Sequence, residues 1–322
     1  MARRLAMFLA VVLMAGMPSP VLAQEPAEGT ITGQVVNGTA DGGSVEGVQV
    51  TLLTYIDDSL AGTRTTDTDE EGGFRFDTVV MEYIYLVSAK YQDVDYYYPV
   101  AFEPGESTAF VEIGVCDTTT EIDIIMAGLV RTIITVEEES IQVTRVYWLV
   151  NESDRTYVGA GDTVLVFDLP EGAYGFTAPG DLMQDFEKLD DNRVTYLVPF
   201  PPGEGQIIYY YQMPLPDDDE LTVPVAVDYP ADAFEVMVAG EDIEAAMSRL
   251  APADPVTDDT GRRYIRFAGE DLARGEAVTL QLSNLPGGGG FSMVVVWIAA
   301  AAVAACVVAF IVVRRKRVSG DD

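Results

Sequence analysis

The sequence contains no histidine, and its only cysteines are Cys116 and Cys306. Without histidine the chain cannot build an imidazole general base, a serine–histidine triad or a histidine-ligated zinc site. Two cysteines are too few for a disulfide-rich scaffold or for a zinc site made of cysteines alone, and their separation excludes a CxxC redox pair. No nucleophile motif stands out among the remaining residues, so we expect neither enzymatic activity nor a cofactor.

Basic residues are also scarce. The chain has 19 lysines and arginines against 52 aspartates and glutamates, which gives a formal net charge of −33. A surface of this sign repels the phosphates of nucleic acids, because their binding requires clustered lysine and arginine. We therefore expect no nucleic-acid partner.

The N-terminus has the three parts of a secretory signal peptide. Arg3 and Arg4 are followed by an apolar stretch over residues 5–16 and then by the small-residue ending Val21-Leu22-Ala23. We predict a signal peptide over residues 1–23 and a short leader over residues 24–28.

A long uncharged segment, residues 291–313, begins at Phe291 and includes Trp297. As an α-helix it would rise about 34 Å, enough to cross the ~30 Å hydrocarbon core of a bilayer. Four bases follow it directly: Arg314, Arg315, Lys316 and Arg317. Because basic residues stay on the cytoplasmic side, we predict a single-pass type I cell-membrane protein. One transmembrane helix would anchor it in the lipid bilayer, with an ectodomain outside and a cytoplasmic tail over residues 314–322.

Two features near this segment leave alternatives open. Residues 286–290 are glycine-rich and predict a flexible linker. Leu285 and Pro286, placed before an apolar stretch and a basic tail, also resemble a cell-wall sorting signal. The small side chains over residues 300–305 would let two helices approach closely, which permits self-association through the membrane.

The region between these ends shows the two-residue alternation of β-strands, with turn residues every few positions. Val48, Val50 and Leu52 alternate with polar residues, and so do Phe74 and Phe76 around Arg75. We predict an all-β ectodomain of two β-sandwich domains, over residues 29–127 and 128–285. One stretch, residues 241–250, has helical spacing instead, with four apolar residues on one face: Ile243, Ala246, Met247 and Leu250.

Residues 29–127 resemble the carboxypeptidase regulatory-like domain. The matching segments are 29–35 (GTITGQV), 47–52 (GVQVTL), 72–76 (GGFRF) and 85–89 (YLVSA). The resemblance implies a transthyretin-like β-sandwich of about seven strands, a module found beside enzymes, in adhesins and in outer-membrane accessory proteins. Its wider structural class, the carbohydrate-binding-like fold, includes sugar-binding modules. The peptidase domain that gives the family its name needs histidine, so the resemblance implies no peptidase activity here. Residues 128–285 match no family that we can name.

Two tyrosine triplets are candidate ligand contacts: Tyr96, Tyr97 and Tyr98, and Tyr209, Tyr210 and Tyr211. In a strand, at least one member of each triplet faces outward. Exposed rings could stack on sugars or bind a protein partner, or they could simply cover the sheet, since strands favour tyrosine.

Two acidic runs are weak candidates for calcium: Asp67, Asp69 and Glu71, and Asp217, Asp218 and Asp219. The first resembles the start of a calcium loop, but Thr78 stands where an EF-hand needs a bidentate glutamate. Solvated turns are the simpler interpretation of both runs. Asn37 and Asn151 also begin glycosylation sequons, which matter only in a host that glycosylates asparagine.

From the sequence we therefore expect a non-enzymatic cell-envelope protein whose ectodomain binds a partner or supports an assembly. A carbohydrate-binding surface module is the alternative, and binding to a glycan would distinguish it.

Overall fold

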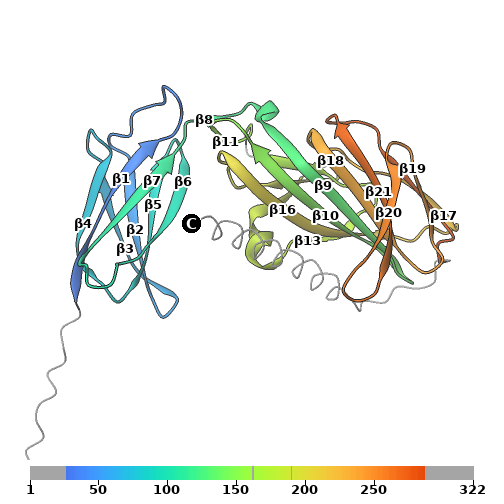
Figure 1. Ribbon diagram of the computed structural model, residues 1–322, viewed down its shortest axis with the longest axis horizontal. Coiled ribbons are helices and arrows are strands. Elements are labelled where there is room, and N and C mark those ends of the chain that lie inside the picture. Colours follow the sequence, from blue (N-terminus) through green and yellow to red (C-terminus); the bar gives the residue numbers. More distant parts are fainter. Residues whose placement is uncertain (1–26, 162, 190, 287–322) are drawn as a thin grey trace, which may run out of the picture.

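The computed structural model describes residues 27–161, 163–189 and 191–286. This part of the chain is all-β, as predicted, and is built from several antiparallel and mixed sheets. Figure 1 shows two β units joined by a narrow connection near β8 (Thr118–Thr119) and β11 (Thr156–Tyr157). Within the described residues, no helix is long and apolar enough to cross a membrane, and the predicted transmembrane segment lies outside them.

The first unit, which we call the first sandwich, consists of two sheets. One sheet has the order β4-β1-β7 and the other β3-β2-β5-β6. The strands are β1 (Glu28–Asn37), β2 (Gln49–Ile56), β3 (Ser59–Asp67), β4 (Gly73–Val80), β5 (Ile84–Tyr91), β6 (Val94–Val100) and β7 (Thr108–Val115). One apolar core lies between the two sheets and includes Ile31, Leu52, Phe76 and Val87. These seven strands in two sheets agree with the predicted sandwich.

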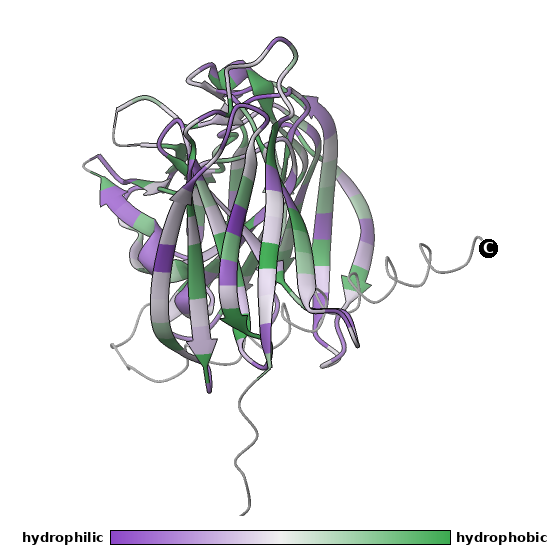
Figure 2. Cartoon of the chain, turned by 90° about the vertical axis from the view of Figure 1, so that its left-hand side faces the viewer, coloured by the Kyte–Doolittle hydropathy of each residue, from purple (hydrophilic) through white to green (hydrophobic). Residues whose placement is uncertain are grey.

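Strand β4 illustrates how the sequence builds this core. Phe74 and Phe76 are buried, whereas Arg75 between them is exposed, because successive side chains of a strand point to opposite faces. In Figure 2 hydrophobic and hydrophilic residues alternate in the same way along the strands of this unit. Gly33 lies opposite Phe74, and a Cβ there would come within 2.3 Å of the phenyl ring, so the core requires glycine.

The second unit, or second sandwich, has one large sheet and two small ones. The large sheet has seven strands in the order β13-β16-β10-β9-β18-β21-β20, and the small sheets have the orders β12-β15-β14 and β17-β22-β19. The large sheet consists of β9 (Ile125–Val136), β10 (Ser140–Asn151), β13 (Tyr174–Thr177), β16 (Gly203–Pro214), β18 (Ala231–Ala239), β20 (Ala251–Thr257) and β21 (Arg263–Leu272). The small sheets consist of β12 (Leu165–Asp168), β14 (Phe186–Leu189), β15 (Arg193–Tyr196), β17 (Glu220–Pro224), β19 (Glu244–Met247) and β22 (Thr279–Ser283). Both small sheets share one apolar core with the same side of the large sheet.

The helix predicted over residues 241–250 is wrong. The structure places strand β19 there, paired with β22, so that Ala245 lies opposite Leu282. Ile243 and Leu250 are buried at either end of the stretch, and their separation of seven residues imitates two helical turns without a helix. Asp242 has a positive φ of 57°, which ends regular structure just before them. Pairing with a neighbouring strand thus overrides the helical periodicity.

The predicted boundary between residues 127 and 128 falls inside a strand. Val115 belongs to the first core and Ile125 to the second, so the chain passes from one sandwich to the other over residues 116–124. This connection contains β8 and a single 3₁₀ turn, η1 (Ile122–Ile124).

Candidate binding surfaces and the junction between the sandwiches

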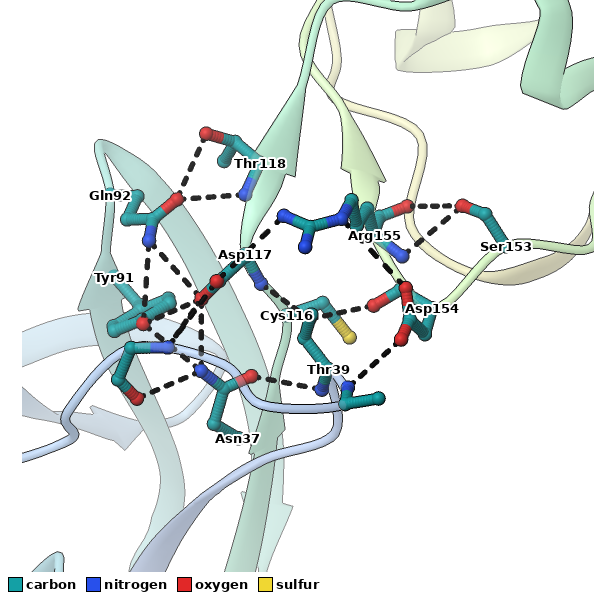
Figure 3. A network of polar contacts seen from close by, with 12 residues as sticks. Asn37, Thr39, Tyr91, Gln92, Cys116, Asp117, Thr118, Ser153, Asp154 and Arg155 are labelled. Atoms are coloured by element: carbon teal, nitrogen blue, oxygen red, sulfur yellow. Dashed lines mark hydrogen bonds and ion pairs between the residues drawn. The ribbon is translucent and has the colours of Figure 1, made fainter.

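A dense polar network holds the two sandwiches together, centred on Asp117 just before β8 (Figure 3). The Asp117 carboxylate accepts a hydrogen bond of 2.9 Å from Asn37 Nδ2 and one of 2.8 Å from the Tyr91 hydroxyl. Longer bonds come from the Gln92 side chain and the Gly43 backbone. These donors, Asn37 foremost, lower the pKa of Asp117. Burial, with the hydrogen bond to Asp117 next, raises the pKa of Tyr91 to about 12.

The second sandwich reaches this network through the loop between β10 and β11. Arg155 Nη1 lies 3.8 Å from Asp117 Oδ2. The Thr39 hydroxyl donates to the Asp154 carbonyl at 2.7 Å and accepts from the Asp117 N–H at 2.8 Å. The Ala40 N–H donates to the Asp154 carboxylate at 2.9 Å. The β1–β2 loop of the first sandwich is thus bonded directly to the second (Figure 3).

Backbone pairing reinforces the junction. Strand β8 pairs in parallel with β11: the Thr156 N–H donates to the Asp117 carbonyl at 2.9 Å, and the Val158 N–H donates to the Thr119 carbonyl at 3.0 Å. The Tyr96 hydroxyl shares a 2.7 Å hydrogen bond with the Thr156 hydroxyl. Because these contacts have specific partners on both sides, they define one relative placement of the two sandwiches.

Both asparagines of the glycosylation sequons use their side chains in hydrogen bonds within the fold. Asn37 Nδ2 donates to Asp117, Gly43 and Tyr91. Asn151 is buried, and its Nδ2 donates to the carbonyls of Arg155 and Phe200. A glycan on Asn151 would have to displace these bonds, so the folded chain does not present it for modification.

Cys116 is half-buried next to this network and forms no disulfide with any residue of the described part of the chain. Burial raises the pKa of its thiol, which disfavours the reactive thiolate form.

The first tyrosine triplet lies on β6, and its members have two different environments. Tyr96 and Tyr98 pack against the first core. Their hydroxyls donate to the carbonyls of Cys116 and Gly114, at 3.0 and 3.3 Å, along the free edge of β7. Tyr97 points the other way and is 55% exposed. Of this triplet, only Tyr97 is open to a ligand.

Tyr97 belongs to an apolar surface on the outer side of the β3-β2-β5-β6 sheet, which we call the first outer face. The register places Leu60, Tyr55 and Ile84 in one row across the sheet. The next row contains Leu53, Leu86 and Pro99, and the third contains Thr51, Ser88 and Tyr97. Ile84 is 61% exposed and Leu60 is 57% exposed. No charged residue stands in these three rows, which is unusual in so acidic a chain.

The second tyrosine triplet lies on β16, where the structure corrects the prediction. Tyr209 and Tyr211 are buried in the second core, because their strand positions face the small sheets. They cannot contact a ligand. Tyr210 faces outward and is half-buried.

Tyr210 lies on the outer side of the seven-stranded sheet, the second outer face. The apolar residues of this face point away from the second core and do not pack against it. They are Leu129, Ile133, Val146, Trp148, Ile208, Tyr210 and Met237. Its central carboxylate, Glu235, lies 2.8 Å from Arg131 Nε and also pairs with Arg266. Burial alone would raise the pKa of Glu235, but the two arginines outweigh it and the pKa is lowered. Sequence analysis did not single out this face, although Trp148 on a strand was the available signal.

The acidic runs lie in exposed turns. Asp69 Oδ1 accepts hydrogen bonds from the backbone N–H groups of Glu71 and Gly73, so this carboxylate closes the turn before β4. Asp67 and Glu71 are exposed beside it. Asp217, Asp218 and Asp219 lie in the exposed loop between β16 and β17. Among the described residues, no group of three or more acidic or cysteine side chains is placed to hold a metal ion.

A hollow of about 240 Å³ opens beside the connection from β15 to β16. Its lining is mostly apolar and includes Val198, Pro199, Phe200 and Pro201, with Glu204 as its carboxylate. The predicted membrane anchor residues lie outside the described part of the chain: Phe291, Trp297, Arg314, Arg315, Lys316 and Arg317.

No known protein family and no curated protein matches this chain. Among solved structures, the major pilin SpaD of Corynebacterium diphtheriae is 13% identical over 78% of this chain and 84% of its own, with a TM-score of 0.23. A DUF3823 family protein of Parabacteroides merdae is 12% identical over 62% of this chain and 92% of its own, with a TM-score of 0.22. A putative protease of Parabacteroides distasonis is 11% identical over 51% of this chain, with a TM-score of 0.31, and the match spans 41% of that protein's length. Similarity this low assigns neither a family nor a function.

Proposed function

We propose that the chain is a non-enzymatic, membrane-anchored protein of the cell envelope, and that its ectodomain binds a protein partner through the first outer face. The observation that carries this proposal is the exposure of Leu60, Ile84 and Tyr97 on three uncharged rows of one sheet face. Contiguous exposed apolar side chains on a soluble domain mark interaction sites. The seven strands of the first sandwich also support a carboxypeptidase regulatory-like module, which is found in adhesins.

The junction suits this role. Its hydrogen bonds involve specific groups on both sandwiches, so the first outer face is held at one orientation to the second sandwich. In an anchored protein, the two sandwiches would then move as one body on the flexible linker predicted at residues 286–290.

Photo-crosslinking in cells tests the proposal. A benzophenone amino acid at position 84 should crosslink a protein partner, because the Ile84 side chain is 61% exposed on this face. Position 110 is the control: Phe110 is 67% exposed on β7, in the other sheet of the same sandwich. Crosslinks at neither position, or equally at both, would contradict a binding role for this face.

A carbohydrate-binding role is the second candidate, favoured by the aromatic rings of this face. The phenol of Tyr55 lies near enough to Tyr97 to help raise its pKa, after burial and Asp95. Two such rings could stack on a neutral glycan. A glycan array with the full chain should then show a signal that Tyr97→Ala removes and Phe110→Ala retains.

The anchoring is tested separately. Protease added to intact cells that lack an outer barrier should remove nearly all of the chain outside residues 291–322. Complete protection would overturn the proposed topology without bearing on the binding face.

A further inference from the structure

Strand β3 (Ser59–Asp67) is an open edge of the first sandwich and borders the first outer face. It is an edge strand of the sheet β3-β2-β5-β6, and all of its residues except Thr66 are exposed. Within the described residues, its backbone pairs with β2 alone. Because an edge strand turns every second N–H and C=O away from its sheet, β3 offers a row of unpaired donors and acceptors.

The other long edges of the two sandwiches are interrupted or covered. The hydroxyls of Tyr96 and Tyr98 occupy two carbonyls along the edge of β7. A positive φ of 56° at Thr78 breaks the regular backbone of β4. Strand β6 contains one proline and β20 two, and proline has no N–H to donate. Strand β3 has no proline, and its one register shift lies near Leu60, which leaves residues 62–67 in regular pairing.

Acidic residues stand at both ends of this edge. Asp57 and Asp58 form the turn that leads into β3, and Asp67 is its last residue. The one base of the strand, Arg64, points to the other side of the sheet, where its guanidinium lies 5.6 Å from the centre of the Phe76 ring. The edge therefore favours a partner with positive charge at two separate positions.

Between these acids, β3 contributes only uncharged side chains to the first outer face. Leu60, Thr63 and Thr65 are its members in the first, second and third rows. Lys90 stands in the same row as Asp67, but it lies two strands away on β5 and pairs with Asp93 at 3.4 Å. A strand placed beside β3 would extend the three uncharged rows by one residue each, and its next outward residues would lie near the acids.

We propose that an extended segment of the partner adds to this sheet as a fifth strand beside β3. The segment would place apolar side chains in the three uncharged rows and a basic side chain at each end. Backbone hydrogen bonds would hold it, and the alternate side chains would give specificity. This inference rests on the proposed function, because it describes how the partner engages the same face.

A second copy of this chain does not have that chemistry at β3. Two β3 strands paired antiparallel would bring the Asp57–Asp58 turn of each copy close to Asp67 of the other. Like charges so placed repel one another, so we expect the segment to come from a different protein.

Hydrogen exchange of the full chain in mild detergent tests the proposal with a synthetic peptide, Lys-Thr-Val-Thr-Ile-Thr-Leu-Thr-Lys. The peptide should protect the backbone N–H groups of β3 and leave those of β4, an edge of the other sheet, unchanged. The same peptide with glutamate in place of lysine should bind at least about tenfold more weakly.

Two N-methylated versions of the peptide separate strand pairing from mere adhesion. One carries methyl groups at the odd positions and the other at the even positions. Because alternate N–H groups of a strand point to opposite sides, only the version that is blocked on the side facing β3 should lose binding.

Variants of the chain locate the contact. Leu60→Asp should weaken peptide binding at least about tenfold, whereas Phe110→Asp, in the other sheet, should not change it. Asp67→Asn should weaken binding about two- to fivefold. Asp95→Asn is its matched control, because Asp95 stands in the same row but on β6, the opposite edge of the sheet. Thr63→Asp replaces Leu60→Asp if circular dichroism shows the latter misfolded.

Three results would overturn the inference: no protection of β3 by the lysine peptide, equal binding of the two N-methylated versions, or equal weakening by Asp67→Asn and Asp95→Asn. A protein crosslinked from position 84, with no protection of β3 by the peptide, would refute strand addition and leave the proposed function standing. Protection of β3 without any crosslink from position 84 would refute the proposed role of the face and retain the strand-binding edge.

Discussion

At the scale of single residues, the most constrained group is a charged cluster buried inside the second sandwich. Arg145 on β10 and Asp228 before β18 are both almost fully buried and lie 3.3 Å apart. Arg145 also donates to the Ala226 carbonyl at 2.7 Å, and Asp228 accepts from the Asp168 N–H at 2.8 Å and from the Tyr147 hydroxyl. Burial raises the pKa of Asp228, and the charge of Arg145 opposes that rise.

Removing both members of this pair should cost less than the two single removals added together. Arg145→Met leaves an unpaired carboxylate in the core, and we expect it to lower the free energy of unfolding by about 3–5 kcal/mol. The double variant Arg145→Met with Asp228→Asn should lose less than the sum of the two single changes, because it leaves no uncompensated charge. Urea denaturation of the three variants measures this, and additive losses would show that the two side chains are not coupled.

The tyrosine triplets show how far single residues could be predicted. Strand alternation correctly requires that each triplet places a residue outward, and Tyr97 and Tyr210 do so. The sequence does not reveal whether the middle tyrosine or the two outer tyrosines face the core, because all three residues are identical. The burial of Arg145 could not be predicted either. A charged residue in a strand predicts an exposed side chain, and only the tertiary structure brings its buried partner Asp228 beside it.

At the scale of the element, β4 gives a direct test of face assignment. Phe76 is buried against the first core and Phe74 packs edge-on against it, with ring centres 6.1 Å apart. We expect Phe76→Ala to destabilise the chain by about 3–5 kcal/mol. Arg75→Ala is the matched control on the same strand, and it should barely move the denaturation midpoint because its side chain is exposed beside Asp77. A larger loss for the arginine variant would contradict the register of β1 and β4.

Most strands could be predicted because burial on one face imposes a period of two, as at Val48, Val50 and Leu52. The short strand β19 could not be predicted, since its pairing with β22 depends on residues 33 to 39 positions away in sequence. The junction between the two sandwiches could not be predicted from the sequence either. Thr39, Asp117 and Asp154 are ordinary polar residues in loops, and only the fold brings them within hydrogen-bonding distance.

At the scale of the whole molecule, the junction should open in acid. Its hydrogen bonds lower the pKa of Asp117, so the ionised form is favoured when the sandwiches are docked. The resulting stabilisation is complete above the ordinary carboxyl pKa of about 3.9 and is lost as the pH falls through the lowered value. We therefore expect the backbone N–H groups of Thr156 and Val158 to lose protection from hydrogen exchange below about pH 4.

Asp117→Asn should weaken the same protection at neutral pH, because an amide replaces an acceptor that serves several donors. Asp69→Asn is the control, since Asp69 closes a turn outside the junction. Equal effects of the two changes, or protection that persists unchanged in acid, would show that the carboxylate of Asp117 does not hold the sandwiches together.

The net charge of −33 sets the response of the molecule to salt. Self-repulsion among exposed carboxylates is screened over about 10 Å at 0.1 M ionic strength, so added sodium chloride should raise the melting temperature.

Calcium at matched ionic strength should raise the melting temperature by the same amount as sodium chloride. The Asp69 carboxylate already accepts hydrogen bonds from the backbone of its own turn, and Asp217, Asp218 and Asp219 follow one another in an exposed loop. The three consecutive residues Asp217, Asp218 and Asp219 cannot all point at one ion, so this loop cannot form a closed cage. Differential scanning calorimetry with each cation checks this. A further rise of several degrees with millimolar calcium, lost in Asp218→Asn and kept in Asp69→Asn, would instead place a calcium site in the β16–β17 loop.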